Sequence, residues 1–529
     1  MADSTHAPAT ASAETTSAPN PNANRSTTPV SSSFKDYISS KWIERTETVP
    51  SPREVAPYAA ERRSRISALH PGERLIIPAG PAKVRSNDTD YTYRPHSAFT
   101  HLTGWGAEAV PDSVLVLEPR FEQRGSGLEP TPDGHDATLY FRPSAGRDSD
   151  EFYANAAIGE FWLGPRPSLA HVAADLSLAT KPISALEEVL EATDAASRIV
   201  READRDLTDQ VDGRRLLNAE LLSDADADTS ADATASFDGT LDTDGDAALL
   251  RDLSELRLVK DAWEIAQMRL AIAATQHGFD DVIADRPAIT AHPRGERLVE
   301  GTFNRRARAE GNQVGYDTIA ASGAHACILH WTTNDGPVVP GELILIDAGV
   351  ELDSLYTADI TRTLPINGSY SEVQRRVYEA VREAADAAFA IVRPGIRFRE
   401  IHAEAMKVIA AKTAEWGLLP VSAEESLDPD AQYHRRYMVH GTSHHLGLDV
   451  HDCAQARREL YLEGVLEPGM VFTIEPGLYF QPDDLTVPAE YRGIGVRIED
   501  NILVTAGGAE NLSIGIPRTA DDVEAWLIG

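Results

Sequence analysis

The chain has 529 residues, 42% of them hydrophobic and 25% charged, as in a soluble globular protein with two or more domains. Its formal net charge of −34 repels nucleic-acid phosphates and anionic membrane surfaces, and no apolar run approaches the ~18 residues that cross a bilayer, so neither partner is expected. Its two cysteines, Cys327 and Cys453, are too few for a disulfide framework or a thiolate metal site.

The N-terminal 33 residues are mainly Ser, Thr, Ala, Pro and Asn, without Leu, Ile, Phe, Trp or Tyr. Such a segment buries too little apolar surface to offset its chain entropy, so we predict a disordered tail over residues 1–33. It also lacks a charged stretch followed by an apolar one, the pattern of a secretory signal. A cytoplasmic location is therefore expected.

Residues 54–200 form the first predicted domain. "YAAERRSRISAL" has the periodicity of a helix, and "RLIIPAG", "SVLVLEP" and "ATLYFRP" have the composition of strands. This mixture predicts an α/β domain that is smaller than the rest of the chain.

An acidic stretch, residues 223–246, contains eight aspartates and no basic residue. Its "DTDGD" is similar to part of a calcium-binding loop, but the spacing is incomplete and no glutamate stands at the closing position. We therefore predict a solvated, flexible insertion. Replacement by a short Gly/Ser linker is expected to leave stability and turnover unchanged.

The remaining residues, 250–515, alternate between helical and strand patterns. A helical periodicity starts at Leu249, and a further amphipathic helix is predicted to begin after Ser371 and to end before Pro394-Gly395. Another helix is predicted in "FREIHAEAMKVIAAKTAEWG". Strands are predicted in "ELILIDAG", "TADITRTLPI", "MVFTIEPGLYF" and "GVRIEDNILVT". The pattern indicates an α+β domain.

Two aspartates lie in adjacent strand-like runs, "LILIDAGVELDSLYTADITRT". If these runs form a hairpin with its turn centred on Asp353, Asp347 and Asp359 face each other with Cβ atoms ~5 Å apart. Like charges in an apolar strand pair are destabilising unless a cation lies between them. The pattern therefore predicts a divalent metal ion.

Two glutamates occupy similar positions, Glu475 in "FTIEPGLYF" and Glu499 in "GVRIEDNIL". Arg497 is two residues before Glu499 and is expected on the same strand face, so an ion pair on a solvated face is the alternative for these two. Four such acids, together with the histidine cluster "HGTSHHLGLDVHD", favour a metal site. The oxygen-rich set favours manganese, with iron, cobalt or zinc as alternatives, and its four negative charges suit two ions.

These motifs, with "ILHWTTND" and "YRGIGVRIEDN", occur in an order that resembles aminopeptidase P of the pita-bread metallopeptidases. The resemblance covers about residues 250–515, and "RPHSAFTHLTGW" resembles more loosely the non-catalytic domain that precedes this fold. It implies an α+β pita-bread catalytic domain after a smaller N-terminal domain. It also implies a homo-oligomer, either a dimer or a tetramer.

The resemblance further implies the metal ligands, which would hold two divalent ions, with Mn²⁺ as the expected metal. They are Asp347, Asp359, His444, Glu475 and Glu499. Asp359 and Glu499 would bridge both ions, and Glu475 would also transfer a proton to the leaving nitrogen.

The resemblance assigns other residues to the substrate. His330 would help to bind it and to stabilise the tetrahedral intermediate, and His451 would contact the substrate carbonyl or the proline side. His440 would line the proline pocket, with Tyr479 in the same neighbourhood and Arg497 steadying the carboxylates. No catalytic role is implied for His445.

The implied activity is removal of the N-terminal residue from peptides whose second residue is proline. Prolidase, which cleaves only Xaa-Pro dipeptides, is the alternative enzyme. The order Thr442-Ser443-His444 is more similar to aminopeptidase P, since prolidases often have Gly before this histidine. Because all five implied ligands are present, a non-catalytic interaction module and the metal-free creatinase are disfavoured. Methionine aminopeptidase would require release of N-terminal Met without proline.

Overall fold

The computed structural model describes residues 28–29, 31–87, 89–124, 127–193, 195–227, 241 and 243–528. The chain forms two compact units, the smaller of which combines residues up to Thr48 with Ala82–Tyr93 and Pro143–Ser168. Most of the predicted tail, residues 1–27 and 30, lies outside the described residues, but helix α1 (Ser32–Ser39) begins within its last positions. In the part of the chain that is described, no helix is both long enough and apolar enough to cross a membrane.

The smaller unit holds few regular elements: α1, β2 (Val84–Ser86), β3 (Thr89–Asp90), α4 (Asp150–Tyr153) and α5 (Glu160–Leu163). Its packing depends on aromatic contacts. The Trp42 and Phe152 rings meet edge to face with centroids 5.7 Å apart, and the Arg147 guanidinium lies 4.2 Å and 4.4 Å from the two centroids. Such contacts take the place of a larger apolar core.

The larger unit begins with a mixed sheet whose strand order is β6-β5-β4-β1-β7. The strands are β1 (Glu73–Pro78), β4 (Val114–Arg124), β5 (Gly127–Phe141), β6 (Ala179–Pro182) and β7 (Ala196–Ile199). The helices are α2 (Ala56–Leu69), α3 (Ser97–Thr103), α6 (Leu169–Leu176) and α7 (Leu186–Glu191). β1 and β4 pair antiparallel, whereas β1 and β7 pair parallel. The predicted mixed α/β character is confirmed.

The acidic stretch differs from its prediction at both ends. Helix α8 (Arg205–Ala227) continues into it, and helix α9 (Asp244–Leu256) begins inside it, while residues 228–240 and 242 lie outside the described residues. Asp246 is buried and accepts a hydrogen bond from the Ile199 amide (2.9 Å). It also pairs with Arg201 (3.0 Å) and Arg215 (2.7 Å). A flexible insertion over the whole of 223–246 is therefore wrong, because its last aspartate neutralises two arginines of the folded domain.

We expect Asp246→Ala to lower the free energy of unfolding by about 2–3 kcal/mol. This is less than the ~3–5 kcal/mol for breaking a fully buried pair, because the Arg201 side chain is 34% exposed. Denaturant unfolding measures the change. Asp209→Ala, at an exposed position of α8, is the control and should cost less than about 0.5 kcal/mol. Equal stability of the two variants would show that the Asp246 ion pairs contribute nothing.

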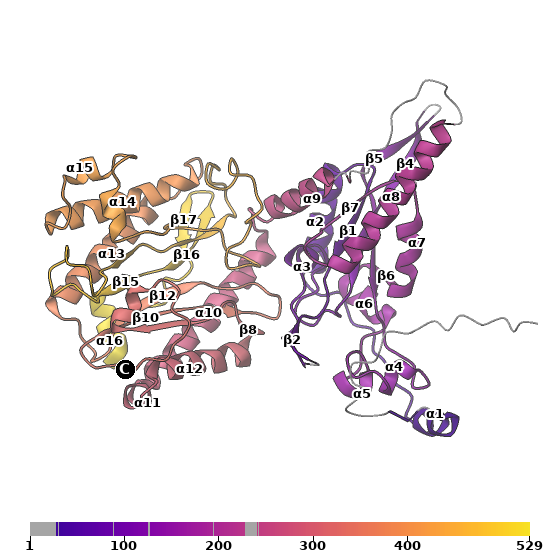
Figure 1. Ribbon diagram of the computed structural model, residues 1–529, viewed down its shortest axis with the longest axis horizontal. Coiled ribbons are helices and arrows are strands. Elements are labelled where there is room, and N and C mark those ends of the chain that lie inside the picture. Colours follow the sequence, from indigo (N-terminus) through magenta and orange to yellow (C-terminus); the bar gives the residue numbers. More distant parts are fainter. Residues whose placement is uncertain are drawn as a thin grey trace, which may run out of the picture. The chain divides into compact units, whose positions relative to one another are not determined.

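The C-terminal part of the larger unit is built from long helices around short strands. Its helices are α10 (Ala262–Ala284), α11 (Arg286–Ala291), α12 (Gly295–Glu310), α13 (Glu372–Ala390), α14 (Phe398–Glu415), α15 (Ala423–Ser426) and α16 (Ala520–Ile528). Helices α13 and α14 pack against each other, as do α10 and α12 (Figure 1). Ser371 caps α13 through a reciprocal capping box with Gln374, as its position predicts. The helical run from Leu249 is split because Asp261 caps a new helix, α10.

Its strands form several small sheets. β12 (Ile360–Pro365), β10 (Leu343–Ala348) and β9 (Ile319–Ser322) make one, and β13 (Val471–Ile474), β16 (Asp500–Thr505) and β17 (Gly508–Asn511) make another. The pairs β14 (Gly477–Tyr479) with β15 (Gly495–Arg497) and β11 (Val350–Glu351) with β8 (Gln313–Val314) complete the set. The α+β class expected for this domain is confirmed.

The hairpin of β10 and β12 has a different register from the predicted one. Asp347 pairs with Thr361, not with Asp359. The turn is centred one residue later than expected, on Ser354, since Leu352 donates its amide to the Tyr356 carbonyl. Moving a turn centre by one residue moves the cross-strand partner by two, so the two aspartates are offset along the hairpin.

Two predicted strands are each broken in two. "MVFTIEPGLYF" becomes β13 and β14, and the break contains Glu475 and Pro476, which has no amide hydrogen for a ladder. "GVRIEDNILVT" becomes β15 and β16, and Glu499 lies in that break. Both glutamates therefore lie between strands, where the backbone is free to turn their side chains toward one point.

Candidate metal centre

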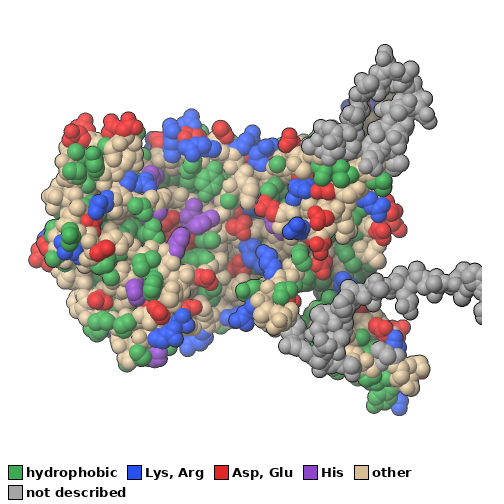
Figure 2. Space-filling view, viewed as in Figure 1, with side chains coloured by type: hydrophobic (Ala, Val, Ile, Leu, Met, Phe, Trp, Pro, Cys, Tyr) green, Lys and Arg blue, Asp and Glu red, His purple; other side chains and the backbone are tan. Residues whose placement is uncertain are grey.

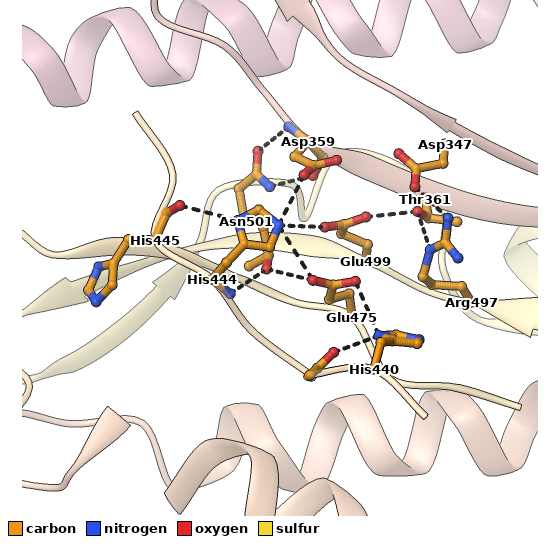
Figure 3. A network of polar contacts seen from close by, with 12 residues as sticks. Asp347, Asp359, Thr361, His440, His444, His445, Glu475, Arg497, Glu499 and Asn501 are labelled. Carbon is orange, nitrogen blue, oxygen red and sulfur yellow. Dashed lines mark hydrogen bonds and ion pairs between the residues drawn. The ribbon is translucent and has the colours of Figure 1, made fainter. Parts of the chain in front are cut away.

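Three of the four acids predicted to bind metal lie around His444, and Asp347 lies farther from it, beside Arg497 (Figure 3). The Nε2 atom of His444 lies 3.2 Å from Asp359 Oδ2, 3.4 Å from Glu475 Oε1 and 3.9 Å from Glu499 Oε1. Asp347 joins them through Tyr316, whose hydroxyl lies 2.7 Å from Asp347 Oδ1 and 2.5 Å from Asp359 Oδ1 and donates its one proton to this pair. Residues far apart in the sequence thus supply a single cluster of carboxylates and one imidazole.

Burial and mutual repulsion disfavour the charged forms of these carboxylates. Burial first, and the charge of Asp359 among others, raise the pKa of Glu475 to about 7 against the opposing charges of His444 and Arg497. Burial first, and then the charge of Asp359, raise the pKa of Glu499 well above its usual value, and burial and then the charge of Asp347 raise that of Asp359. Without a cation, the protein therefore disfavours having these carboxylates charged together.

The donor set fits a divalent cation. Asp359, His444 and Glu499 each offer a ligand atom, and these atoms all lie within 4.8 Å of one another. Among the residues that the structure describes, the buried Glu499 Oε1 has no hydrogen-bond partner. An orphaned buried carboxylate oxygen costs free energy unless a cation or a donor occupies its lone pairs, so this observation supports metal binding.

Three polar residues that sequence reasoning missed hold the carboxylates in place. The Thr361 hydroxyl donates to Glu499 Oε2 (2.7 Å). The Asn501 side chain holds the Asp359 backbone, because its Oδ1 accepts from the Asp359 amide (3.2 Å) and its Nδ2 donates to the Asp359 carbonyl (2.5 Å). Tyr316 joins the two aspartates, and burial raises its pKa well above the usual value, so its hydroxyl stays a donor. Thr361 and Asn501 lie two residues after predicted ligands, and this spacing was the available signal. Tyr316 lies outside every motif.

We expect Tyr316→Phe to weaken metal binding by about 10–100-fold, the usual effect of losing a group that orients ligands. The variant removes the one hydroxyl that lies between the Asp347 and Asp359 carboxylates. Titration of metal-free protein with Mn²⁺ measures the affinity. Tyr37→Phe, at a position that is 78% exposed in the smaller unit, should bind Mn²⁺ as the parent does. A Tyr316→Phe affinity equal to that of this control would contradict the prediction.

Arg497 steadies the carboxylates, but not through Glu499. Its guanidinium bonds Asp347 Oδ2 (2.5 Å) and the Thr361 hydroxyl (3.1 Å). Its side chain is 5% exposed, and the described residues show no ion pair between it and Glu499. The alternative of a Glu499–Arg497 pair on a solvated face is therefore wrong.

A hydrogen-bond chain connects Arg497 to His440. The Nδ1 atom of His440 lies 2.6 Å from the Gly441 carbonyl, which only accepts, so Nδ1 carries the proton. Burial and then the charge of Arg497 lower the pKa of His440 to about 3, so the ring is neutral and its Nε2 accepts from the Tyr479 hydroxyl (2.7 Å). That hydroxyl accepts in turn from Arg497 (3.1 Å). The chain fixes the tautomer and the orientation of His440.

The remaining histidines differ in whether they lie on the surface near His444 or are buried away from the carboxylates. His451 lies against His444 with ring centroids 4.4 Å apart, and burial, then the charges of His444 and His330, lower its pKa to about 4. His330 and His451 are exposed, and Figure 2 shows histidine side chains gathered on the surface of the C-terminal part. His445 points away from the carboxylates (Figure 3) and stacks on Phe398 with centroids 4.6 Å apart.

A buried cluster of charged residues holds the C-terminal end of the histidine-rich segment, residues 440–452, in place. Asp452, which is 1% exposed, follows His451 directly and binds Arg257 Nε (2.9 Å) and Lys260 Nζ (3.2 Å). Arg94 of the N-terminal part donates to the Leu448 carbonyl (2.6 Å). The loop between His444 and Asp452 forms no helix or strand beyond an isolated bridge of His445 to Phe472, so these contacts help to determine where its side chains lie.

Comparisons with known proteins agree with this geometry. Residues 266–506 match the model of metallopeptidase family M24, and residues 58–200 match that of the aminopeptidase P N-terminal domain. The chain is 48% identical to Xaa-Pro aminopeptidase 2 of Streptomyces coelicolor over 488 residues, which cover 92% of this chain and 94% of the relative.

Solved structures give the same result. Aminopeptidase PepP of Pseudomonas aeruginosa matches with a TM-score of 0.70 and 30% identity, covering 89% of this chain and 98% of that one. Aminopeptidase P of Escherichia coli with the inhibitor Pro-Leu matches with a TM-score of 0.72 and 29% identity, covering 90% and 99%. The chain therefore belongs to the aminopeptidase P branch of metallopeptidase family M24.

Proposed function

We propose that this chain hydrolyses the bond between an N-terminal residue and a following proline, with two divalent ions, preferably Mn²⁺, as cofactors. The observation that carries the proposal is the cluster of Asp359, Glu475 and Glu499 around His444, with the unpartnered Glu499 oxygen in it and Asp347 joined through Tyr316. The relatives' name, Xaa-Pro aminopeptidase, supports the substrate class. So does the inhibitor Pro-Leu of the Escherichia coli enzyme, since it begins with proline as the second product would.

Asp347, Asp359, His444, Glu475 and Glu499 would hold the ions. The ions would supply a water-derived nucleophile and polarise the scissile carbonyl. Glu475 would also carry a proton from the nucleophile side to the leaving nitrogen.

The histidines would act on the substrate. His330 and His451, both exposed, would stabilise the developing charge on the carbonyl oxygen. The bond before proline is a tertiary amide without N–H, so recognition has to use the ring. His440, fixed by Tyr479 and Arg497, would form a wall of the proline pocket.

Prolidase activity is the alternative, and the length of the substrate separates the two. Purified protein with added Mn²⁺ is incubated with Xaa-Pro and with Xaa-Pro-Yaa, and the products are resolved by chromatography. The proposal expects the longer peptide to release one free amino acid. Cleavage confined to the dipeptide would assign prolidase instead. Manganese content near two ions per chain tests the number of ions, and a homo-oligomer is expected from size measurements in solution.

A further inference from the structure

The segment that carries His330 lacks regular structure. It connects β9 to β10 and, after a short 3₁₀ turn over Gly323–Cys327, runs to residue 341 without a helix or strand. His330 itself is exposed and comes directly before Trp331. The hydrogen bonds of a helix or strand therefore do not fix the position of His330, and contacts with side chains outside this segment have to do so.

One carboxylate of helix α12 accepts hydrogen bonds from several parts of this segment. Glu296 lies in the first turn of α12 and is 0% exposed. Its Oε1 accepts from the Ser322 amide (2.8 Å) and from His325 Nδ1 (2.8 Å). Its Oε2 accepts from the Gly336 amide (2.7 Å) and from Trp331 Nε1 (3.0 Å). The same two oxygens thus hold both ends of the segment and two side chains between them.

Two further sets of contacts restrict the chain on either side of His330. The His325 ring stacks on Trp331 with centroids 3.9 Å apart and an angle of 26° between the planes. Asn334, which is 1% exposed with φ of 48°, accepts from the Ala320 amide (3.0 Å) and donates to the Thr318 carbonyl (2.8 Å). Asn is one of the few residues that adopt positive φ readily, so it suits this turn. These contacts fix the chain on both sides of His330.

We propose that Glu296 is a positioning residue for catalysis, which acts by fixing the Trp331 side chain and so the place of His330. The inference rests on the role of His330 in the proposed function. A histidine that stabilises a transition state has to lie within a fraction of an ångström of its place, and a displacement of ~1 Å can cost about a hundredfold in rate. Glu296 supplies that precision, because charge-assisted bonds to a buried carboxylate are short and strong.

The test is a double-mutant cycle on the manganese-loaded enzyme with Glu296→Gln and His330→Ala. Each Glu296 oxygen accepts two N–H donors, so an amide placed in either orientation turns its NH₂ toward donors. We expect Glu296→Gln to lower kcat by roughly ten- to hundredfold, with Mn²⁺ content unchanged and KM altered by less than about threefold. In the His330→Ala background the same substitution should cost less than about twofold. Glu310→Gln, near the other end of α12, is the control and should keep the parent kcat.

Equal losses in both backgrounds would mean that Glu296 acts independently of His330, and the inference would fall while the proposed function stands. Full activity of His330→Ala alone would overturn the role of His330 and the inference together. If Glu296→Gln does not fold, Trp331→Phe replaces it in the cycle, because Phe keeps an aromatic ring next to His325 and removes the N–H that bonds Glu296. Its kcat should fall several-fold in the parent and not in His330→Ala, and an unchanged parent kcat would overturn the inference.

Discussion

Replacing Asp359 with Asn should remove nearly all activity together with the bound metal. Asp359 lies at the centre of the cluster, where its Oδ2 is 3.2 Å from His444 Nε2. The substitution keeps the shape of the side chain but removes a negative charge from the group proposed to serve both ions. We expect turnover to fall by more than about a thousandfold, well beyond the loss seen when only a supporting group is removed.

Elemental analysis and turnover at saturating peptide measure this effect. Asp353→Asn is the matched control, since this exposed aspartate lies in the turn region of the same hairpin and should keep both metal and activity. The fold of the Asp359 variant should survive, because Asn501 holds the backbone and not the carboxylate of Asp359. An Asp359→Asn protein with the parent's metal content and turnover would show that the ligand assignment is wrong.

Replacing His330 with Ala should lower kcat by more than about tenfold while the Mn²⁺ content stays that of the parent. His330 is exposed, and its charge is among the causes that lower the pKa of His451, which lies against His444. We therefore expect it to act on the substrate and not on the ions. An interaction made only in the transition state changes kcat and kcat/KM alike, so KM should change little.

Kinetics and metal analysis of the same preparation separate the two roles that His330 could have. His277→Ala is the histidine control, at an exposed position of α10. Loss of metal from His330→Ala, with kcat recovered at high Mn²⁺, would make His330 a metal-supporting residue instead. Unchanged kcat would remove it from the mechanism.

The boundaries of several elements could be predicted from local chemistry. Ser371 and Gln374 form the capping box that begins α13, and the helix ends at Ala390, before Pro394. The hairpin register could not be predicted in the same way. It depends on where a loop turns, and here the centre is Ser354 because Leu352 bonds Tyr356, a choice of one residue that composition does not reveal.

The acids of the site could be predicted because four carboxylates in apolar surroundings are rare without a cation. The residues that hold these acids in place could not be predicted. Tyr316 and Thr361 are ordinary in the sequence, and their importance arises only when distant strands bring them to the carboxylates. The same holds for Asp246. It lies at the end of an acidic stretch whose composition predicts exposure to solvent, but in the fold it pairs with Arg201 and Arg215. Long-range pairing of this kind leaves no periodic signal.

Hydrolysis of a matched pair of peptides, Xaa-Pro-Yaa and Xaa-Ala-Yaa, tests the central claim most directly. Each is incubated with metal-free protein, with Mn²⁺-loaded protein and with loaded protein after chelation, and the released amino acids are resolved by chromatography. We predict that free Xaa appears only from the proline peptide and only with the loaded enzyme, and that Mn²⁺ restores the chelated sample. Equal cleavage of the alanine peptide, or cleavage by metal-free protein, would contradict a metal-dependent enzyme that recognises proline in second position.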